Sequence, residues 1–258
     1  MNILHSPKVI IGSLAFLLFA GISTASAQFE GSLEVNRYSI SQDGSEDLKA
    51  NYNLSLSPER ILFSNAEGAK AIDMMGAIEA NAILVRNDIE DFVFLGNRSE
   101  AVVLQKKELL SMISLMENMK GMNESNSSQG TNSKKRFAET SETQTIDGYS
   151  AKKWLMQTAG SNEVFHVWLT DEMNIEWGLL SEPWLTDLTL FSDLPFTEWM
   201  SKGQSPILVE RFVGDVLTDR IAMENIEQKS IPGNRFDIPE GTEIVTFQQL
   251  LLQRMSGM

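Results

Sequence analysis

His166 is the residue with the widest chemical repertoire in this chain, and few other groups could work beside it. Cysteine is absent, and the second histidine, His5, lies near the N-terminus. A Ser-His-Asp triad needs a serine held against its histidine, yet no Gly-x-Ser-x-Gly turn occurs. His166 alternates with Val164 and Trp168 in a predicted strand, so we expect it to be structural. Cys/His zinc sites are excluded by composition.

Carboxylates are abundant, with 35 Asp and Glu against 21 Lys and Arg and a formal charge of −14. This charge repels phosphates and argues against nucleic-acid binding. The adjacent pairs Glu90-Asp91 and Asp171-Glu172 are of the kind that ends a strand. Two carboxylates are enough for glycosidase chemistry, so a hydrolase stays as a third hypothesis. Otherwise we expect no catalytic residue, no metal and no cofactor.

Large apolar side chains are unevenly distributed. All five tryptophans fall between Trp154 and Trp199, and several of the 13 methionines lie at Met112, Met116 and Met119. Clustered tryptophans fit either an aromatic core or the lip of an apolar pocket. Methionine fills gaps in a core and also adapts to variable apolar ligands. Both interpretations stay open at this point.

Period-two alternation predicts the elements that must position these residues. Phe29 to Asn36 and Leu48 to Leu56 alternate apolar and polar residues around a turn at Asp43-Gly44. Shorter strands of the same kind follow at residues 60–64, 82–86, 91–95 and 101–105. After the middle of the chain we expect strands at residues 140–146, 149–158, 164–170, 207–213 and 217–227.

Helical spacing appears in three places. Between Lys106 and Lys120 the apolar residues recur every three or four positions. A second helical stretch opens at Pro183, and a last helix places Phe247, Leu251 and Met255 on one side. Residues 121–133 are polar and poor in large apolar groups, so we predict a disordered insertion at about 121–136.

Many short strands with few helices predict a mainly β (α+β) fold, a curved antiparallel half-barrel that wraps its helices. We expect one domain at residues 28–258. Two domains separated by the insertion are the alternative, although each half has few strands with which to close a sheet.

The N-terminal segment has the form of an export signal. Lys8 precedes the apolar run Val9–Ala20, and Ala25-Ser26-Ala27 fits a signal-peptidase site. The run is shorter than the roughly 20 residues that span a bilayer. We expect cleavage after Ala27, a mature chain that does not span the membrane, and a periplasmic or secreted location. No cysteine follows for lipid attachment.

Several motifs resemble the DUF4412 family of exported bacterial proteins. They are Thr145–Trp154 and Val167–Met173, with Phe29–Gly31 at the start and Gly203–Ile207 and Phe236–Gly241 later. The polar insertion and the acidic, methionine-rich first half depart from the family pattern. The family is more distantly similar to the LolA and LppX type of periplasmic lipoprotein carriers. That resemblance implies a half-open antiparallel barrel with helices over a cavity for acyl chains, and no catalytic residue.

The leading hypothesis is therefore a non-enzymatic exported protein that holds a lipid acyl chain or a lipidated partner. The alternative is a structural or interaction module of the cell envelope, with a filled core and a protein partner. The residues expected to line the apolar wall come from the first strands, the first helix and the tryptophan region: Leu33, Val35, Tyr52, Leu54, Met112, Ile113, Met116, Trp154 and Trp168.

Overall fold

The structure is a computed structural model of the 258-residue chain. It describes residues 28–65, 72–74, 78–96, 100–111, 114, 135–158, 160–182 and 196–256. Several sequence predictions lie outside these residues: the export signal, nearly all of the insertion, the helical stretch from Pro183, and Met112, Ile113 and Met116.

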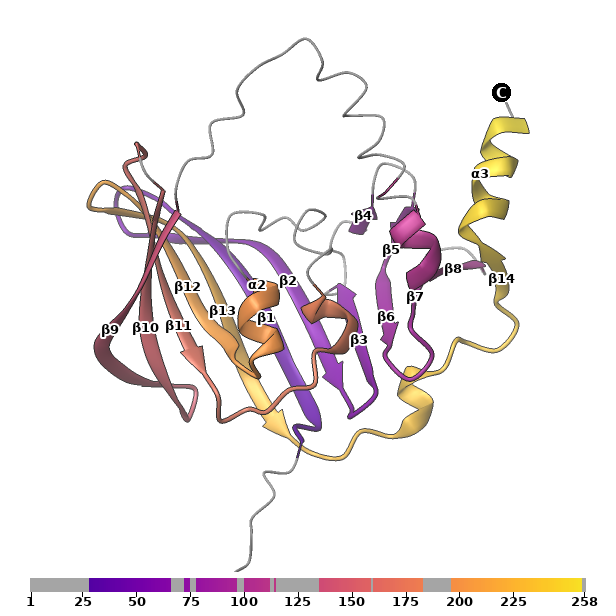
Figure 1. Cartoon of the computed structure of the whole chain (residues 1–258), viewed down its shortest axis with the longest axis horizontal. Coiled ribbons are helices and arrows are strands. Elements are labelled where there is room, and N and C mark those ends of the chain that lie inside the picture. Colours follow the sequence, from indigo (N-terminus) through magenta and orange to yellow (C-terminus); the bar gives the residue numbers. More distant parts are fainter. Residues whose placement is uncertain are drawn as a thin grey trace, which may run out of the picture.

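One sheet of twelve strands dominates the fold, in the order β14-β8-β7-β6-β3-β2-β1-β13-β12-β11-β10-β9. It curls into an open trough (Figure 1). All neighbouring strands are antiparallel except β14 and β8, which are parallel. The predicted mainly β fold with a curved, unclosed antiparallel sheet is confirmed.

Most strand bounds lie within a few residues of the sequence pattern, although one strand begins five residues earlier than expected and three short strands were not predicted. In the first half the strands are β1 (Gly31–Ile40), β2 (Glu46–Leu56), β3 (Arg60–Asn65), β6 (Ala82–Arg86), β7 (Asp91–Leu95) and β8 (Glu100–Gln105). In the second half they are β9 (Lys135–Ile146), β10 (Tyr149–Thr158), β11 (Glu163–Thr170), β12 (Ser205–Val213), β13 (Val216–Gln228) and β14 (Glu243–Thr246). A separate pair is formed by β4 (Ile72–Met74) and β5 (Ile78–Ala80).

The first strand lies in the middle of the sheet, because β1 pairs with β2 on one side and with β13 on the other. Strands from before and after the predicted insertion thus belong to one sheet. Lys135 and Arg136, which the sequence pattern assigns to the insertion, are the first residues of β9.

The hairpin turns form where Asp-Gly pairs permit a positive φ. Asp147 and Gly148 have φ values of 47° and 87° in the turn between β9 and β10. Both central residues of a type I′ turn need positive φ, which suits the twist of the flanking strands. Gly44 has a φ of 81° in the turn between β1 and β2. The turn predicted at Asp43-Gly44 is present, and a second turn joins the strands predicted at residues 140–146 and 149–158.

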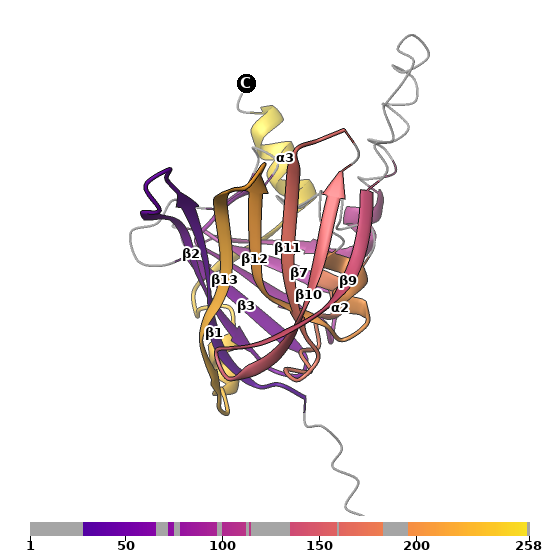
Figure 2. The same ribbon diagram turned by 90° about the vertical axis from the view of Figure 1, so that its left-hand side faces the viewer.

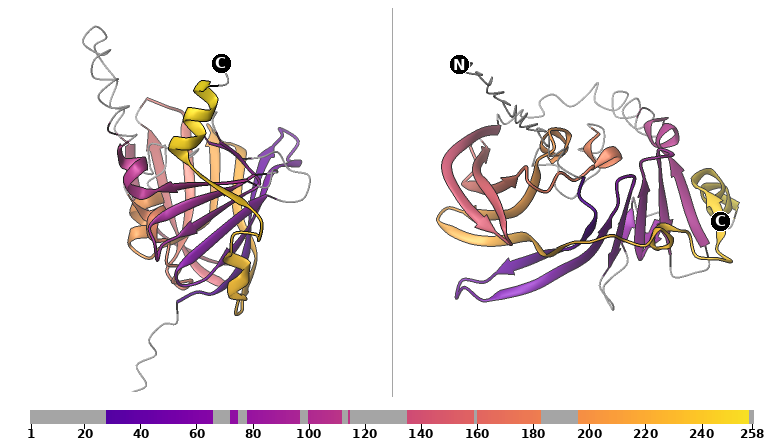
Figure 3. Two further views of the ribbon diagram at one scale, coloured as in Figure 1. Left: turned by 90° about the vertical axis from the view of Figure 1, so that its right-hand side faces the viewer. Right: turned by 90° about the horizontal axis from the view of Figure 1, so that it is seen from below.

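Strands β3, β6, β7 and β8 bury both of their faces. Consecutive residues such as Ile61 and Leu62, or Leu84 and Val85, are all buried, although neighbours along a strand point to opposite sides. One face joins the largest core cluster. The other is covered by residues 229–238 (Figure 3). Phe236, in the 3-10 helix η4 (Gly233–Phe236), belongs to the cluster on that side.

Short helices lie on the concave side of the trough (Figure 3). These are the 3-10 helix η2 (Gly178–Ser181) and α2 (Phe196–Ser201). Figure 2 shows β9 to β13 from their outer side with α2 behind them. Residues 106–111 are helical as predicted, and α3 (Phe247–Ser256) follows β14. Within the described ranges, no helix is long and apolar enough to cross a membrane.

Candidate functional site

The inner face of the sheet is the face that packs against α2. Trp199 of α2 is buried in a cluster with residues of three neighbouring strands: Met156, Val167, Leu169 and Val209. Cα partners in antiparallel strands project to the same face, so a row of side chains can be followed from strand to strand. One such row crosses the inner face from β10 to β1: Trp154, Val167, Val209, Ile221 and Arg37.

The cluster around Trp199, called the α2 cluster below, keeps aromatic surface open to solvent. The rings of Phe137 and Phe196 meet Trp199 edge-on, with centroids 6.2 and 5.8 Å away. Trp154, Phe165 and Phe196 are only partly buried, and Phe137 is 40% exposed. Edge-on contacts stabilise aromatic pairs beyond the area they bury. The α2 cluster therefore leaves part of its aromatic surface exposed to solvent.

The predicted apolar wall is only partly accessible. Leu33 and Leu54 are each 2% exposed and Trp168 is 7% exposed, all in the largest core cluster. Val35 and Tyr52 pack against that cluster and are half-buried. All five side chains belong to this large cluster or pack against it, and three of them have little surface left for a ligand.

Trp154 lies apart from these residues, against the α2 cluster. It is opposite Val167, whereas Trp168, the next residue along β11, is opposite Lys153. The two tryptophans therefore project from opposite faces of the sheet. The Lys153 ammonium lies 5.7 Å from the centroid of the Trp168 ring. The sequence places both tryptophans on one wall, and the register separates them.

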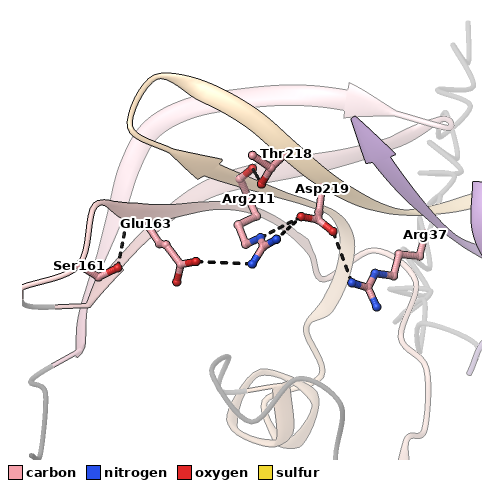
Figure 4. A network of polar contacts seen from close by, with 6 residues as sticks. All are labelled: Arg37, Ser161, Glu163, Arg211, Thr218 and Asp219. Atoms are coloured by element: carbon pink, nitrogen blue, oxygen red, sulfur yellow. Dashed lines mark hydrogen bonds and ion pairs between the residues drawn. The ribbon is translucent and has the colours of Figure 1, made fainter. Parts of the chain in front are cut away.

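A network of charged side chains connects β11, β12, β13 and β1 (Figure 4). Arg211 donates from Nε to Asp219 Oδ2 at 2.9 Å and also from Nη2. Arg211 Nη1 lies 3.5 Å from Glu163 Oε1. Arg37 donates from Nη2 to Asp219 Oδ1 at 3.4 Å. Two guanidinium groups thus converge on one carboxylate, and the second carboxylate is held loosely at the end of the network.

Asp219 is the most buried member of this network, with 17% of its side chain exposed. Burial by itself raises the pKa of the carboxyl group. Hydrogen bonds and charge from Arg211, with hydrogen bonds from Thr218 and Arg37, outweigh burial and hold the pKa of Asp219 below its ordinary value. The carboxylate is therefore ionised at neutral pH and fixes both arginines.

The polarity of the inner face changes along the strands. Arg37 is two residues beyond Val35 in β1, and Arg211 is two residues beyond Val209 in β12. Residues two apart share a face, so each charged group follows an apolar one on the same side. In each strand the charged residue is nearer the hairpin turns at residues 41–45 and 214–215, here called the hairpin rim. An apolar surface deeper in the trough thus adjoins a charged band toward this rim.

Two of the residues that the sequence singled out for chemistry, His166 and Asp91, contact neighbouring side chains. His166 is adjacent to Val167 and so points away from the inner face; its ring centroid lies 4.4 Å from that of Phe212. Burial, and then the charge of Lys153, lowers the pKa of His166. Asp91 accepts two hydrogen bonds from Arg86, at 2.8 and 2.7 Å. In the described part of the chain, no group of three His, Asp or Glu residues could hold a metal ion.

The charged network is absent from the sequence-based prediction. In the sequence, Arg37, Arg211 and Asp219 are ordinary charged residues near the ends of strands. They can be recognised as a network only when strands β1, β13 and β12 are known to be neighbours. Trp199 belonged to the noted tryptophan group, but its helix, α2, was not predicted.

We compared the chain with known families, curated sequences and solved structures. Neither a protein-family model nor a curated sequence matches the chain. Two solved structures of PNGF-II, in the P21 and C2 space groups, align with 87% of this chain at 12% and 13% identity, with TM-scores of 0.44 and 0.41. The chain covers 33% and 32% of the length of those two chains.

Proposed function

We propose that this protein is an exported, non-enzymatic binding protein that holds an acyl chain of a lipid or of a lipidated partner. The chain would lie beside α2, on the partly exposed aromatic side chains of the α2 cluster. The supporting observation is the partly exposed aromatic surface on the inner face, where Phe137, Trp154 and Phe165 surround Trp199. Membership of the DUF4412 family and a periplasmic or secreted location are part of the same proposal.

Apolar burial provides enough driving force for such binding. Each Å² of apolar surface removed from water contributes roughly 25 cal/mol, or about 0.8 kcal/mol for every CH₂ group. An acyl chain that buries half of its methylenes on this surface therefore gains several kcal/mol. The protein needs no catalytic group for this task, because dispersion and burial hold the ligand.

The second candidate is a structural or protein-interaction module of the cell envelope. It is favoured by one observation: Leu33 and Leu54 are almost completely buried by the protein itself, in a cluster that also contains Trp177 and Leu179 of the η2 region. In that case the concave side serves only as a core, and the protein acts through its outer surface.

Two measurements separate these functions. Mass spectrometry of an organic extract of the purified protein should detect acyl chains in about stoichiometric amounts. A fluorescent fatty acid should bind saturably to the delipidated protein. If neither extract nor titration shows acyl binding, the structural module is the better description.

A matched pair of variants locates the site. Phe137→Asp places a carboxylate on the exposed edge of the α2 cluster, where a bound chain would desolvate it at a cost of several kcal/mol. We expect binding of the fluorescent fatty acid to weaken at least about tenfold. Ile244→Asp makes the same type of change at a 57% exposed position of β14, at the other end of the sheet, and should leave binding unchanged. Equal effects would place the ligand elsewhere.

A further inference from the structure

We propose that the ligand is an amphiphile with an anionic headgroup, and that Arg37 binds this headgroup through its carboxylate or phosphate. This inference rests on the proposed acyl-binding function and adds the headgroup class to it.

Arg37 has hydrogen-bond donors that its ion pair does not use. Its side chain is 49% exposed, and among the described residues its guanidinium makes one ion pair, to Asp219 at 3.4 Å. A guanidinium has five N–H donors in a planar fork that matches a carboxylate or phosphate. Most of these donors are available to a ligand on the inner face.

The two carboxylates of the network neutralise Arg211 more fully than Arg37. Asp219 is engaged by Arg211 through two hydrogen bonds and so balances that arginine first. Glu163 lies on the Arg211 side of the network, 3.5 Å from Nη1. Arg37 is therefore the incompletely balanced cation of the network (Figure 4). The chain as a whole repels anions, because its formal charge is −14. A half-exposed cation beside an apolar surface therefore attracts an anion to this one place.

Arg37 lies beside the apolar surface of the α2 cluster. Its partner across the strand pair is Ile221, which packs against the α2 cluster. Arg37 thus lies in the same row of side chains that contains Val209 and Val167. Neighbouring strands are about 4.8 Å apart, so an acyl chain on this row would bring a terminal carboxylate or phosphate within reach of the guanidinium.

Arg211 supports this arrangement without being free itself. Its hydrogen bonds fix Asp219, and Asp219 in turn holds Arg37 at the hairpin rim. A charge-assisted, forked pair between Arg37 and an anion would be short and directional. It would orient the amphiphile with its headgroup toward β1 and its chain toward Trp199.

The test compares a fluorescent polyene fatty acid with its methyl ester, which has the same chain and no charge. Arg37→Gln should weaken binding of the acid about tenfold and leave binding of the ester unchanged. Arg136→Gln removes the same charge from an exposed position of β9, next to Phe137, and should change neither ligand. Arg37→Lys keeps the charge without the fork and should retain binding of the acid at an intermediate affinity. Circular dichroism spectra of all variants should match wild type.

Each other outcome has a distinct meaning. If Arg37→Gln weakens acid and ester equally, or changes neither while wild type binds both, the headgroup assignment is wrong and the acyl-binding function stands. If wild type binds neither ligand, the acyl-binding function itself fails. Displacement of the fatty acid by millimolar inorganic phosphate or acetate would show that Arg37 serves a free anion, and would also overturn the assignment.

Discussion

At the scale of single residues, Asp219 determines the geometry of the charged network. It accepts hydrogen bonds from two arginines that lie on neighbouring strands β12 and β1, either side of its own strand β13. A carboxylate that is mostly buried can be ionised only when such partners compensate its lost hydration. Removing its charge leaves both arginines without their shared acceptor.

We therefore expect Asp219→Asn to lower the free energy of unfolding by about 1–2 kcal/mol at pH 7. The pKa of Asp219 is lowered in the folded protein, so its stabilising effect is complete above the ordinary value of 3.8 and declines as the pH falls through the folded pKa. Urea unfolding of wild type and variant should show a difference that is constant from pH 7 to about 5 and shrinks below pH 4.

Asp47→Asn is the control for this experiment. Asp47 pairs with Lys49, but 65% of its side chain is exposed, and exposed ion pairs stabilise proteins by less than about 1 kcal/mol. This variant should differ from wild type by no more than about 0.5 kcal/mol. A loss equal to that of Asp219→Asn would show that the network contributes nothing beyond an ordinary surface pair.

At the scale of elements, the backbones of β1 and β13 approach each other closely at Gly31. Asn225 has a φ of 53°, and the register of β13 against β1 shifts by one residue between Ser32 and Glu34. A Cβ atom on Gly31 would overlap the carbonyl oxygen of Glu227. Glycine is required here because the two backbones approach so closely.

Gly31→Ala should therefore lower the free energy of unfolding by at least about 2 kcal/mol, because β1 must move away from β13 or lose hydrogen bonds to it. The matched control is Gly233→Ala, since a Cβ atom at Gly233 meets no atom within 4 Å. Gly233→Ala should be close to neutral in the same urea titration. If both alanines are tolerated, the bulge at Asn225 absorbs the added methyl group.

Local patterns predict the strands far better than they predict their partners. Alternation and Asp-Gly turns locate β1, β2, β9 and β10 because each hairpin is specified by nearby residues. The short strands β4, β5 and β14 have no such signature. Strand β14 has four residues and is parallel to β8, more than a hundred positions earlier. Helix α2 has only six residues, too few for helical periodicity to be recognised.

The candidate site shows the same limit. Leu33 and Leu54 were predicted on one face because period two fixes the face within a hairpin, and they do share one cluster. Whether that face is open or filled depends on η2, whose residues give no periodic signal. The placement of Arg37 near the α2 cluster depends on the pairing of β1 with β13, which brings together residues almost two hundred positions apart.

At the scale of the whole molecule, the two halves of the sheet are covered differently. Strands β3 and β6 to β8 bury both faces, with residues 229–238 packed on one of them. In β9 to β13 the inner face packs on the short helix α2, and the opposite face carries polar side chains such as Lys153, His166 and Glu210. Among the described residues, β3 and β6 to β8 bury both faces, whereas the inner face of β9 to β13 packs on the six-residue helix α2.

This asymmetry predicts where the molecule opens. Amides in β3, β6, β7 and β8 should exchange with deuterium more slowly than those in β9 to β13, because opening free energies follow the burial of each unit.

If acyl chains bind on the α2 cluster, adding the fluorescent fatty acid should slow exchange in α2 and in β9 to β13 and leave β3 to β8 unchanged. The ligand stabilises only the states that bind it, by an amount that grows with the ratio of its concentration to Kd. The uncharged methyl ester should protect α2 and the strands near Trp199 equally well, but not the residues around Arg37. Protection confined to β3 to β8, or spread evenly over the sheet, would place the binding surface outside the half that α2 covers.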